Sequence, residues 1–137
     1  MKIAVVTDST AYLTKEEYAE YGVYVLPMSV IFGQETYREE IDITSEEFYA
    51  KVKSSPVFPT STQPAVGETY ELFRELAKDY DAIIPITISS GISGTYQTCV
   101  AVAEDMKDEV AIYPIDSEIS CAPQARAVKL AAIMAKS

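Results

Sequence analysis

The 137-residue chain contains no histidine and no tryptophan. The absence of histidine excludes a Ser-His-Asp triad, a Cys-His dyad and most zinc sites, because each of them needs an imidazole. Long hydrophobic runs are absent too. No apolar stretch approaches the roughly 20 residues that span a bilayer, so we expect no stable membrane insertion. The first residues also lack the long apolar segment of a signal peptide, because Asp8 interrupts them.

Basic residues are scarce: 11 Lys and Arg stand against 21 Asp and Glu, which gives a net charge of −10. This charge argues against nucleic acid and anionic membranes as partners. The hydrophobic content of 48% is typical of a globular protein, and the length suffices for one domain with its own core. Cys99 and Cys121 have small or apolar neighbours, so we expect both to be reduced core residues of a cytoplasmic protein.

Predicted strands and helices alternate along the chain. The hydrophobic patterns predict strands at 2–7, 23–26, 28–32, 35–38, 82–88 and 110–115. Capping boxes and apolar stripes predict helices at 14–21, 44–53, 66–80 and 96–106, and from about 119 onwards. A hairpin turn is expected at Gly33 and Gln34, and residues 54–64 are expected to form a loop. The alternation predicts an α/β fold: a mainly parallel sheet with helices on both faces, in three layers.

The loop after the predicted strand 82–88 carries the strongest functional signal. Loops at the carboxyl ends of parallel strands are where ligands bind in open sheets. Gly91 and Gly94 would let the backbone approach a ligand, and Ser93 could cap the following helix. Free amides at that helix start, with the hydroxyls of Ser89, Ser90 and Ser93, predict a site for the anionic end of a ligand.

Polar residues also follow two other predicted strands. They are Asp8, Ser9 and Thr10 after the first strand, and Asp116 and Ser117 after the last. The loop 60–64 precedes a helix and could join them. Each loop alone is explained by ordinary turn and cap chemistry. Together they predict a cluster of hydroxyls and amides at one edge of the sheet, which suits a carboxylate better than a polyphosphate because Lys and Arg are few.

Asp8 allows a second interpretation. An aspartate after the first strand of an α/β fold can be a phosphoryl-accepting nucleophile. Such enzymes set a second acid nearby to hold magnesium, whereas positions 9 and 10 are Ser and Thr. We therefore favour a structural role for Asp8, and a similar one for Asp116. Residues 91–94 are too short for a P-loop and no Lys follows them, so we expect neither a metal nor a cofactor.

Five stretches, taken in order, resemble one known family. They are Val-Thr-Asp-Ser-Thr-Ala at 6–11, Leu-Pro-Met-Ser-Val-Ile-Phe-Gly at 26–33, Pro-Thr-Ser-Thr-Gln-Pro at 59–64, Ile-Ser-Ser-Gly-Ile-Ser-Gly-Thr-Tyr-Gln at 88–97, and Ile-Asp-Ser at 115–117. The chain resembles the DegV family, whose members include the fatty-acid-binding subunits of bacterial fatty acid kinases. One stretch alone would be weak, but the five together cover almost the whole chain.

The resemblance implies that residues 1–137 form the N-terminal lipid-binding domain, and that the family's C-terminal domain is absent from this chain. It also implies that the carboxylate of a long-chain fatty acid binds Ser61, Thr62, Ser93 and Gly94. The supporting loops would supply Asp8, Ser9, Thr10, Ser90, Asp116 and Ser117. The family typically has Thr-Ser where this chain has Ser61 and Thr62, which keeps the hydroxyl donors but moves the methyl group.

Other positions also depart from the family pattern. The family often has glycine at the positions of Glu40, Pro123 and Ala125, and a helix-capping serine at that of Ala65. The acyl chain would need a slot between the sheet and its helices, and the same residues would equally close a solid core. The residues considered for this slot are Val5, Ile31, Phe32, Tyr70, Phe73 and Ile92.

The leading hypothesis is a bacterial, cytoplasmic carrier of a long-chain fatty acid, without catalytic residues of its own. By the resemblance, it would present the carboxylate to a separate fatty acid kinase, which makes acyl phosphate for phospholipid synthesis. The alternative is a phosphotransfer or hydrolase-type enzyme domain that uses Asp8 or Ser93. A third possibility is a folded half that cannot bind lipid alone.

Overall fold

The computed structural model describes residues 1–137 and is built around a five-stranded parallel sheet. The strands are, in spatial order, β2 (Val23–Leu26), β1 (Ile3–Asp8), β6 (Ala82–Thr87) and β7 (Ala111–Ile112), with β8 (Ile115–Asp116) pairing to the far end of β6. Every pairing in this sheet is parallel. The central strand β1 is buried over most of its length, as its continuous apolar sequence predicts for a strand covered on both faces.

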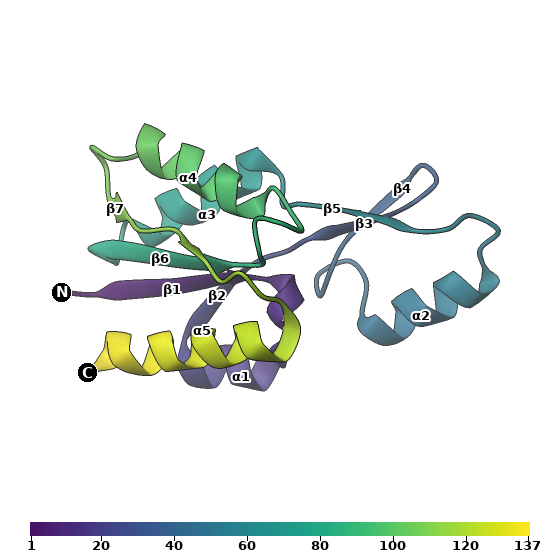
Figure 1. Ribbon diagram of the computed structural model, residues 1–137, viewed down its shortest axis with the longest axis horizontal. Coiled ribbons are helices and arrows are strands. Elements are labelled where there is room, and N and C mark those ends of the chain that lie inside the picture. The colour runs from purple at the N-terminus through teal and green to yellow at the C-terminus, as the bar shows by residue number, and fades with distance from the viewer.

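Two helices cover each face of this sheet (Figure 1). On one face lie α3 (Val66–Leu76) and α4 (Thr95–Asp105), and on the other lie α1 (Lys15–Tyr21) and α5 (Cys121–Lys136). Successive β1 residues serve opposite faces: Val6 belongs to the same core cluster as Phe73 of α3, whereas Val5 packs in the cluster of Val128 of α5. The predicted three-layer α/β fold is confirmed.

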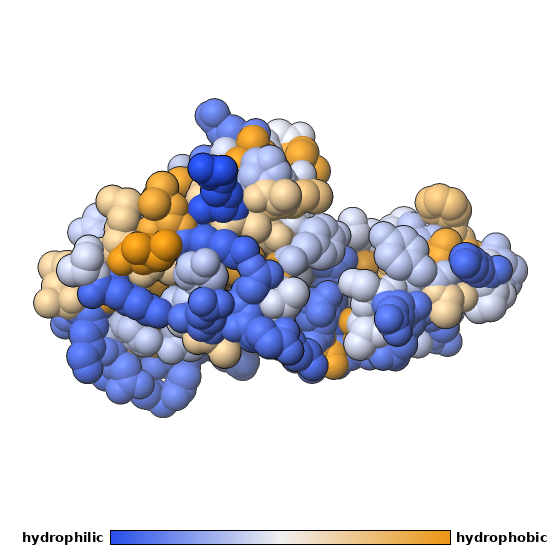
Figure 2. All heavy atoms as spheres, turned by 90° about the horizontal axis from the view of Figure 1, so that it is seen from below, coloured by the Kyte–Doolittle hydropathy of each residue, from blue (hydrophilic) through white to orange (hydrophobic).

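A smaller lobe extends from one end of the main sheet. It contains a three-stranded antiparallel sheet and one helix: β4 (Glu35–Arg38), β3 (Ser29–Phe32), β5 (Thr60–Thr62) and α2 (Ser45–Ser54). Val30, Phe32 and Ile43 form its own small core. Seen from below in Figure 2, the lobe projects from the larger body, and hydrophilic residues cover much of the surface.

The helix ends follow the sequence signals closely. Thr14 caps α1 with a complete capping box, and Gly22 ends that helix with a left-handed φ of 65°. Thr44 caps α2, where its hydroxyl accepts a hydrogen bond from the backbone N–H of Glu47 at 3.2 Å. Pro123 lies in the first turn of α5, where its missing N–H costs no helical hydrogen bond. No helix of the fold is both long and apolar enough to cross a bilayer.

Three sequence predictions were wrong in detail. Part of the expected loop 54–64 forms β5, which pairs antiparallel with β3. The expected strand 110–115 is divided into β7 and β8, because Pro114 between them has no N–H to donate to the sheet. Cys121 is exposed at the start of α5, whereas Cys99 is buried as expected.

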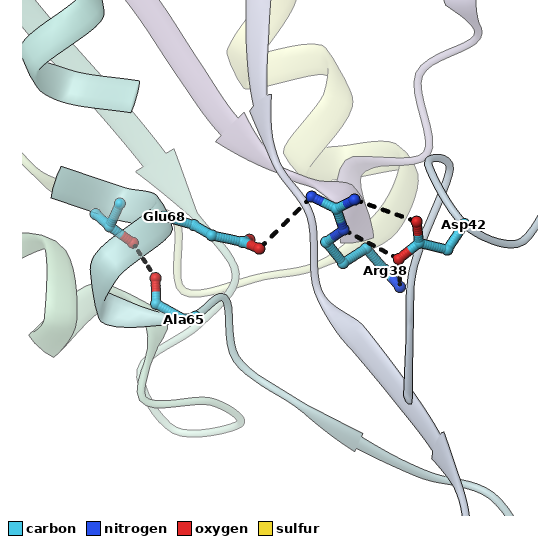
Figure 3. Close-up of polar contacts among 5 residues, drawn as sticks. Arg38, Asp42, Ala65 and Glu68 are labelled. Carbon is cyan, nitrogen blue, oxygen red and sulfur yellow. Dashed lines mark hydrogen bonds and ion pairs between the residues drawn. The ribbon is translucent and has the colours of Figure 1, made fainter. Parts of the chain in front are cut away.

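The Arg38 side chain connects the lobe to the larger body (Figure 3). Its guanidinium donates to Asp42 in the same lobe, with Nε 3.0 Å from Oδ2 and Nη2 3.2 Å from Oδ1. Its Nη1 lies 3.7 Å from Oε1 of Glu68 in the first turn of α3. The side chains are partly exposed, so the contact sets an orientation more than it adds stability.

Candidate ligand-binding site

The Asp8 carboxylate joins the ends of the central strands. Its Oδ2 accepts a hydrogen bond from the backbone N–H of Ile88 at 2.7 Å. Its Oδ1 accepts from the N–H of Thr10 at 3.0 Å and from the side-chain amide of Gln124 at 3.2 Å. The side chain is fully buried, and both of its oxygens are occupied by protein donors. Asp8 therefore fixes the loops after β1 and β6 relative to α5.

Asp116, at the end of β8, fixes the loop after β6 from the other side. Its Oδ1 accepts hydrogen bonds from the backbone N–H of Ser90 at 3.1 Å and of Glu118 at 3.0 Å, and its Oδ2 accepts from the Ser90 hydroxyl. These bonds hold the pKa of the Asp116 carboxyl below its usual value, and the bond from the Ser90 hydroxyl has the largest effect. The next residue, Ser117, donates its backbone N–H to the carbonyl of Thr87.

A polar cavity of about 440 Å³ lies where these loops meet the lobe. Five of the residues expected at the site line it: Thr10, Ser61, Thr62, Ser93 and Gly94. The other expected residues, Asp8, Ser9, Ser90, Asp116 and Ser117, lie outside this lining. The structure thus brings hydroxyl groups from β5 and from the loop before α4 around one space.

The start of α4 differs from the expected capping arrangement. Gly94, and not Ser93, is the N-cap residue of α4, and a glycine has no side chain with which to cap that end. The Ser93 hydroxyl instead accepts from the backbone N–H of Thr95 at 3.3 Å and lies 2.9 Å from the Thr95 hydroxyl. A side chain at position 94 would overlap the amide of Gln63, which itself donates to Thr98 at 3.1 Å. Glycine at 94 therefore lets the β5 segment approach the helix.

A second, more apolar cavity of about 460 Å³ lies inside the lobe, between α2 and the small sheet. Its apolar lining includes Val30, Ile43, Phe48, Val52 and Phe58. Tyr12, Glu39 and Ser61 line both this apolar cavity and the polar cavity, so the two spaces adjoin. No lysine or arginine lines either one. Both volumes lie within the roughly 300–1,000 Å³ that is usual for small-molecule sites.

Most of the residues expected to line a slot between the main sheet and its helices are packed in cores or lie on the surface instead. Val5 and Phe73 are almost completely buried in the two solid core clusters. Phe32 is buried in the lobe core, and the Tyr70 hydroxyl is bonded to Asp105 on the surface. Of the six residues considered for the slot, only Ile92 lines either of the two adjoining cavities. A separate cavity of about 320 Å³, lined by Val5 of β1, Tyr21 of α1 and Ala132 of α5, lies between the sheet and these helices. It shares no lining residue with the two adjoining cavities at the lobe.

Sequence reasoning missed Tyr12 and Glu39, which stand at the junction of the two cavities. Tyr12 has a left-handed backbone with φ of 52°, directly after the polar residues that follow β1. Burial raises the pKa of its phenol, and Glu39 adds to the shift. Glu39 follows β4 and accepts a hydrogen bond from the Ser9 hydroxyl at 2.7 Å. The only feature of the sequence that pointed to this junction is the position of Tyr12, two residues after the Asp-Ser-Thr loop.

The whole fold contains no group of three or more His, Cys, Asp or Glu side chains placed to hold a metal ion. The Asp8 carboxylate is fully buried, and the Ser93 hydroxyl is bonded to a threonine and to no base. The site therefore offers hydrogen-bond donors beside an apolar space, and this arrangement suits an amphipathic ligand.

Comparison with known proteins adds three findings. The family model described as uncharacterised proteins of the DegV family matches residues 2–137. Protein DegV of Bacillus subtilis is 50% identical over 124 residues, which cover 90% of this chain and 44% of that protein. A crystal structure described as DegV, a fatty acid binding protein from Bacillus subtilis, superposes with a TM-score of 0.95 at 47% identity, covering 99% of this chain and 48% of that one.

A crystal structure of a stearic-acid-binding protein from Eubacterium ventriosum is more distant. It has a TM-score of 0.90 and 28% identity, over 98% of this chain and 47% of that one. The chain therefore spans less than half the length of these similar proteins.

Proposed function

This chain belongs to the DegV family, and from that membership and its two adjoining cavities we propose that it binds a long-chain fatty acid. The carboxylate would occupy the polar cavity, and the acyl chain would lie in the apolar cavity of the lobe. The junction formed by Tyr12, Glu39 and Ser61 carries this proposal, because it connects a hydroxyl-lined space to an apolar one. Similar solved structures are described as binding fatty acids.

The polar cavity supplies neutral donors for the carboxylate. A carboxylate that leaves water must be hydrogen-bonded, or the site rejects it. The hydroxyls of Ser61, Thr62 and Ser93 come from two segments that meet at this cavity, and the uncapped start of α4 adds free backbone amides. Ser61 and Thr62 are exposed, so the carboxylate would remain partly hydrated, and neutral donors then suffice.

The apolar cavity supplies the larger share of the binding free energy. Each methylene removed from water contributes about 0.8 kcal/mol, so ten of them contribute roughly 8 kcal/mol before the costs of ordering the chain and losing translational freedom. Phe48 and Val52 of α2 pack against the small core that contains Val30 of β3, and all three line this space. The lobe, and not the main sheet, would therefore determine which acyl chains fit.

We extend the proposal to the fate of the ligand: the chain would present the carboxylate to a separate kinase that forms acyl phosphate. Two observations support a carrier without chemistry of its own. The Asp8 carboxylate is fully buried and both of its oxygens accept hydrogen bonds from the protein, so it is not exposed to an incoming phosphoryl group. Ser93 has no adjacent base to activate its hydroxyl, and the chain has no histidine.

Direct binding tests the proposal. The chain is titrated with palmitate and oleate and followed by native mass spectrometry, and a longer protein that contains it is titrated in parallel. Val52→Trp fills the apolar cavity and should weaken binding at least about tenfold, because several methylenes lose their place. Val100→Trp adds the same bulk to the exposed face of α4 and should bind as the unmodified chain does.

The outcomes separate the three hypotheses. Failure of both the chain and the longer protein to bind either acid would refute the proposal. Binding by the longer protein alone would show that this chain is a half-site. Release of phosphate from an added acyl phosphate or phosphoester without any partner, lost in Asp8→Asn or Ser93→Ala, would instead support the enzyme hypothesis.

A further inference from the structure

Glu39 is held at the junction of the two cavities by its neighbours. Its backbone N–H donates to the carbonyl of Met28 at 2.8 Å, and its Oε2 accepts from the Ser9 hydroxyl at 2.7 Å. The Ser9 oxygen also accepts the backbone N–H of Met28 at 2.9 Å, so the serine is itself fixed. Oε1 of Glu39 receives no hydrogen bond from the protein. The half-buried carboxyl thus has one bound oxygen and one available oxygen, beside a space proposed to take an anion.

No positive charge from this chain balances that carboxyl. Glu40 follows it along the chain, Asp8 faces it from the end of β1, and the Tyr12 phenol faces it from the segment before α1. Two further tyrosines lie near these neighbours: Tyr18 on α1 is influenced by the charges of Asp8 and Glu40, and Tyr49 on α2 interacts with Tyr12. All these groups are acidic or neutral, and no lysine or arginine lines either cavity. Burial, with added repulsion from Glu40 and Asp8, raises the pKa of the Glu39 carboxyl.

Two carboxylates close together in a partly buried site repel each other, which favours the uptake of a proton by one of them. We propose that Glu39 takes up that proton when a fatty acid carboxylate occupies the polar cavity, so that ligand binding is coupled to proton uptake. The proton comes from solvent and resides on the available oxygen of Glu39. That O–H then donates to the ligand carboxylate, as a charge-assisted hydrogen bond. This inference rests on the proposed function and adds its regulation by pH.

The sign of the pH dependence follows directly. The complex holds one more proton than the free protein plus free ligand wherever Glu39 is ionised in the free protein. Affinity therefore falls as pH rises above the pKa of free Glu39, by at most about tenfold per pH unit, and becomes independent of pH below it. A site built on hydroxyls alone would show no such slope.

The test separates protonation of Glu39 from protonation of the ligand. Palmitate and hexadecanesulfonate, which stays ionised throughout, are titrated calorimetrically from about pH 5.5 to about pH 8.5, a range that spans the raised carboxyl pKa values known in proteins. Repeating each titration in buffers of different ionisation enthalpy gives the protons taken up per ligand. The proteins are the unmodified chain, Glu39→Gln, Glu39→Asp and Glu46→Gln, with urea unfolding as the check on folding.

The unmodified chain should take up about one proton with either ligand at the upper end of this range. Glu39→Gln, which keeps an acceptor for Ser9, should take up none with the sulfonate and should bind it about tenfold more tightly near pH 8. Glu39→Asp keeps a titrating carboxyl and should still take up a proton. Glu46→Gln removes an exposed charge at the start of α2 and should behave as the unmodified chain does.

A proton count with the sulfonate that is unchanged in Glu39→Gln would overturn this inference and leave the proposed function standing. If no ligand binds to any of these proteins at any pH, the proposed function fails and this inference fails with it. Proton uptake with palmitate but none with the sulfonate, in the unmodified chain, would place the proton on the ligand and also overturn the role of Glu39.

Discussion

The side-chain amide of Gln124 donates a hydrogen bond to the Asp8 carboxylate at 3.2 Å, and this bond joins the last helix to the end of the first strand. The same amide nitrogen lies 3.0 Å from the Thr7 hydroxyl, and the Gln124 carbonyl oxygen accepts from the Thr10 hydroxyl at 3.0 Å. Gln124 is fully buried, as are Asp8 and Thr7. A neutral amide therefore completes the hydrogen bonding of a charge within the core, beneath the polar cavity.

Replacing this amide should cost stability. Gln124→Leu fills a similar volume but removes a donor from each of the buried Asp8 and Thr7 side chains, so the free energy of unfolding should fall by about 1–3 kcal/mol. Urea unfolding followed by circular dichroism measures the change. Gln97→Leu, at an exposed position of α4, should change stability by no more than about 0.5 kcal/mol. Equal effects of the two substitutions would show that the Gln124 network adds nothing.

Loss of a single hydroxyl should weaken fatty acid binding without unfolding the chain. Ser93→Ala should lower the affinity for palmitate about tenfold or more, since a hydrogen bond to a charged group contributes about 1.5–3 kcal/mol. Comparing Ser61→Ala with Thr62→Val shows which of this pair touches the carboxylate. Ser54→Ala, at the exposed end of α2, is the control. Unchanged affinity in all three site variants would place the carboxylate outside the polar cavity.

The bonds from Ser90 to Asp116 should make stability depend on pH in the acid range. The folded-state pKa of Asp116 is the lowered one. The stabilisation is therefore present above the unfolded-state pKa of about 3.9 and is lost as pH falls through the folded value.

Asp116→Asn should accordingly lower the melting temperature at neutral pH, and its difference from the unmodified chain should shrink below about pH 4. Thermal unfolding at a series of pH values measures this. Ser90→Ala should reproduce most of the loss and add little in the Asp116→Asn background, because both substitutions remove the same interaction. A difference that stays constant with pH would mean that these bonds do not favour the ionised carboxyl.

The uncapped start of α3 can be improved. Ala65 has the extended backbone of an N-cap residue but no side chain that can accept from the first turn of the helix. Ala65→Ser should raise the free energy of unfolding by about 1 kcal/mol, measured by urea unfolding. Ala101→Ser, at an exposed position inside α4, should instead lower it by a few tenths of a kcal/mol, because serine is a poorer helix former than alanine. A gain at both positions would rule out capping as the cause.

The backbone at Glu40 is left-handed, with φ of 65°, which fits the glycine that the DegV family often has there. Glu40→Gly and Glu40→Ala remove the same carboxylate, but only glycine removes the strain of a Cβ in this conformation. The glycine variant should be more stable than the alanine variant by about 1 kcal/mol. Equal midpoints of urea unfolding for the two variants would contradict this.

The sequence predicted the parts of the fold that depend on local patterns. Strand β1 is a continuous apolar run and is buried on both faces, and Thr14 and Gly22 mark both ends of α1. The convergence of the Asp8, Ser90 and Asp116 loops followed from a general rule: parallel strands end at a shared edge. These inferences needed no knowledge of which side chains touch.

The lobe was harder to predict because its structure depends on distant contacts. The residues of β5 are Thr, Ser and Thr between prolines, and they form a strand only because β3 offers a partner. An apolar residue that lines a cavity has the same sequence pattern as one that fills a core. The sequence therefore does not distinguish Val52, which lines the apolar cavity, from Phe73, which fills the main core. In the sequence, Glu39 resembles any other exposed acid, because its contacts with Ser9 and Met28 come from distant parts of the chain.

The interruption of the outer strand at Tyr113 and Pro114 has a consequence for how copies of this protein meet. On either side of it, β7 and β8 are only two residues long. A strand from another molecule could not pair along this edge, because the edge offers no continuous row of free N–H and C=O groups. The broken edge thus discourages edge-to-edge aggregation without any added charge.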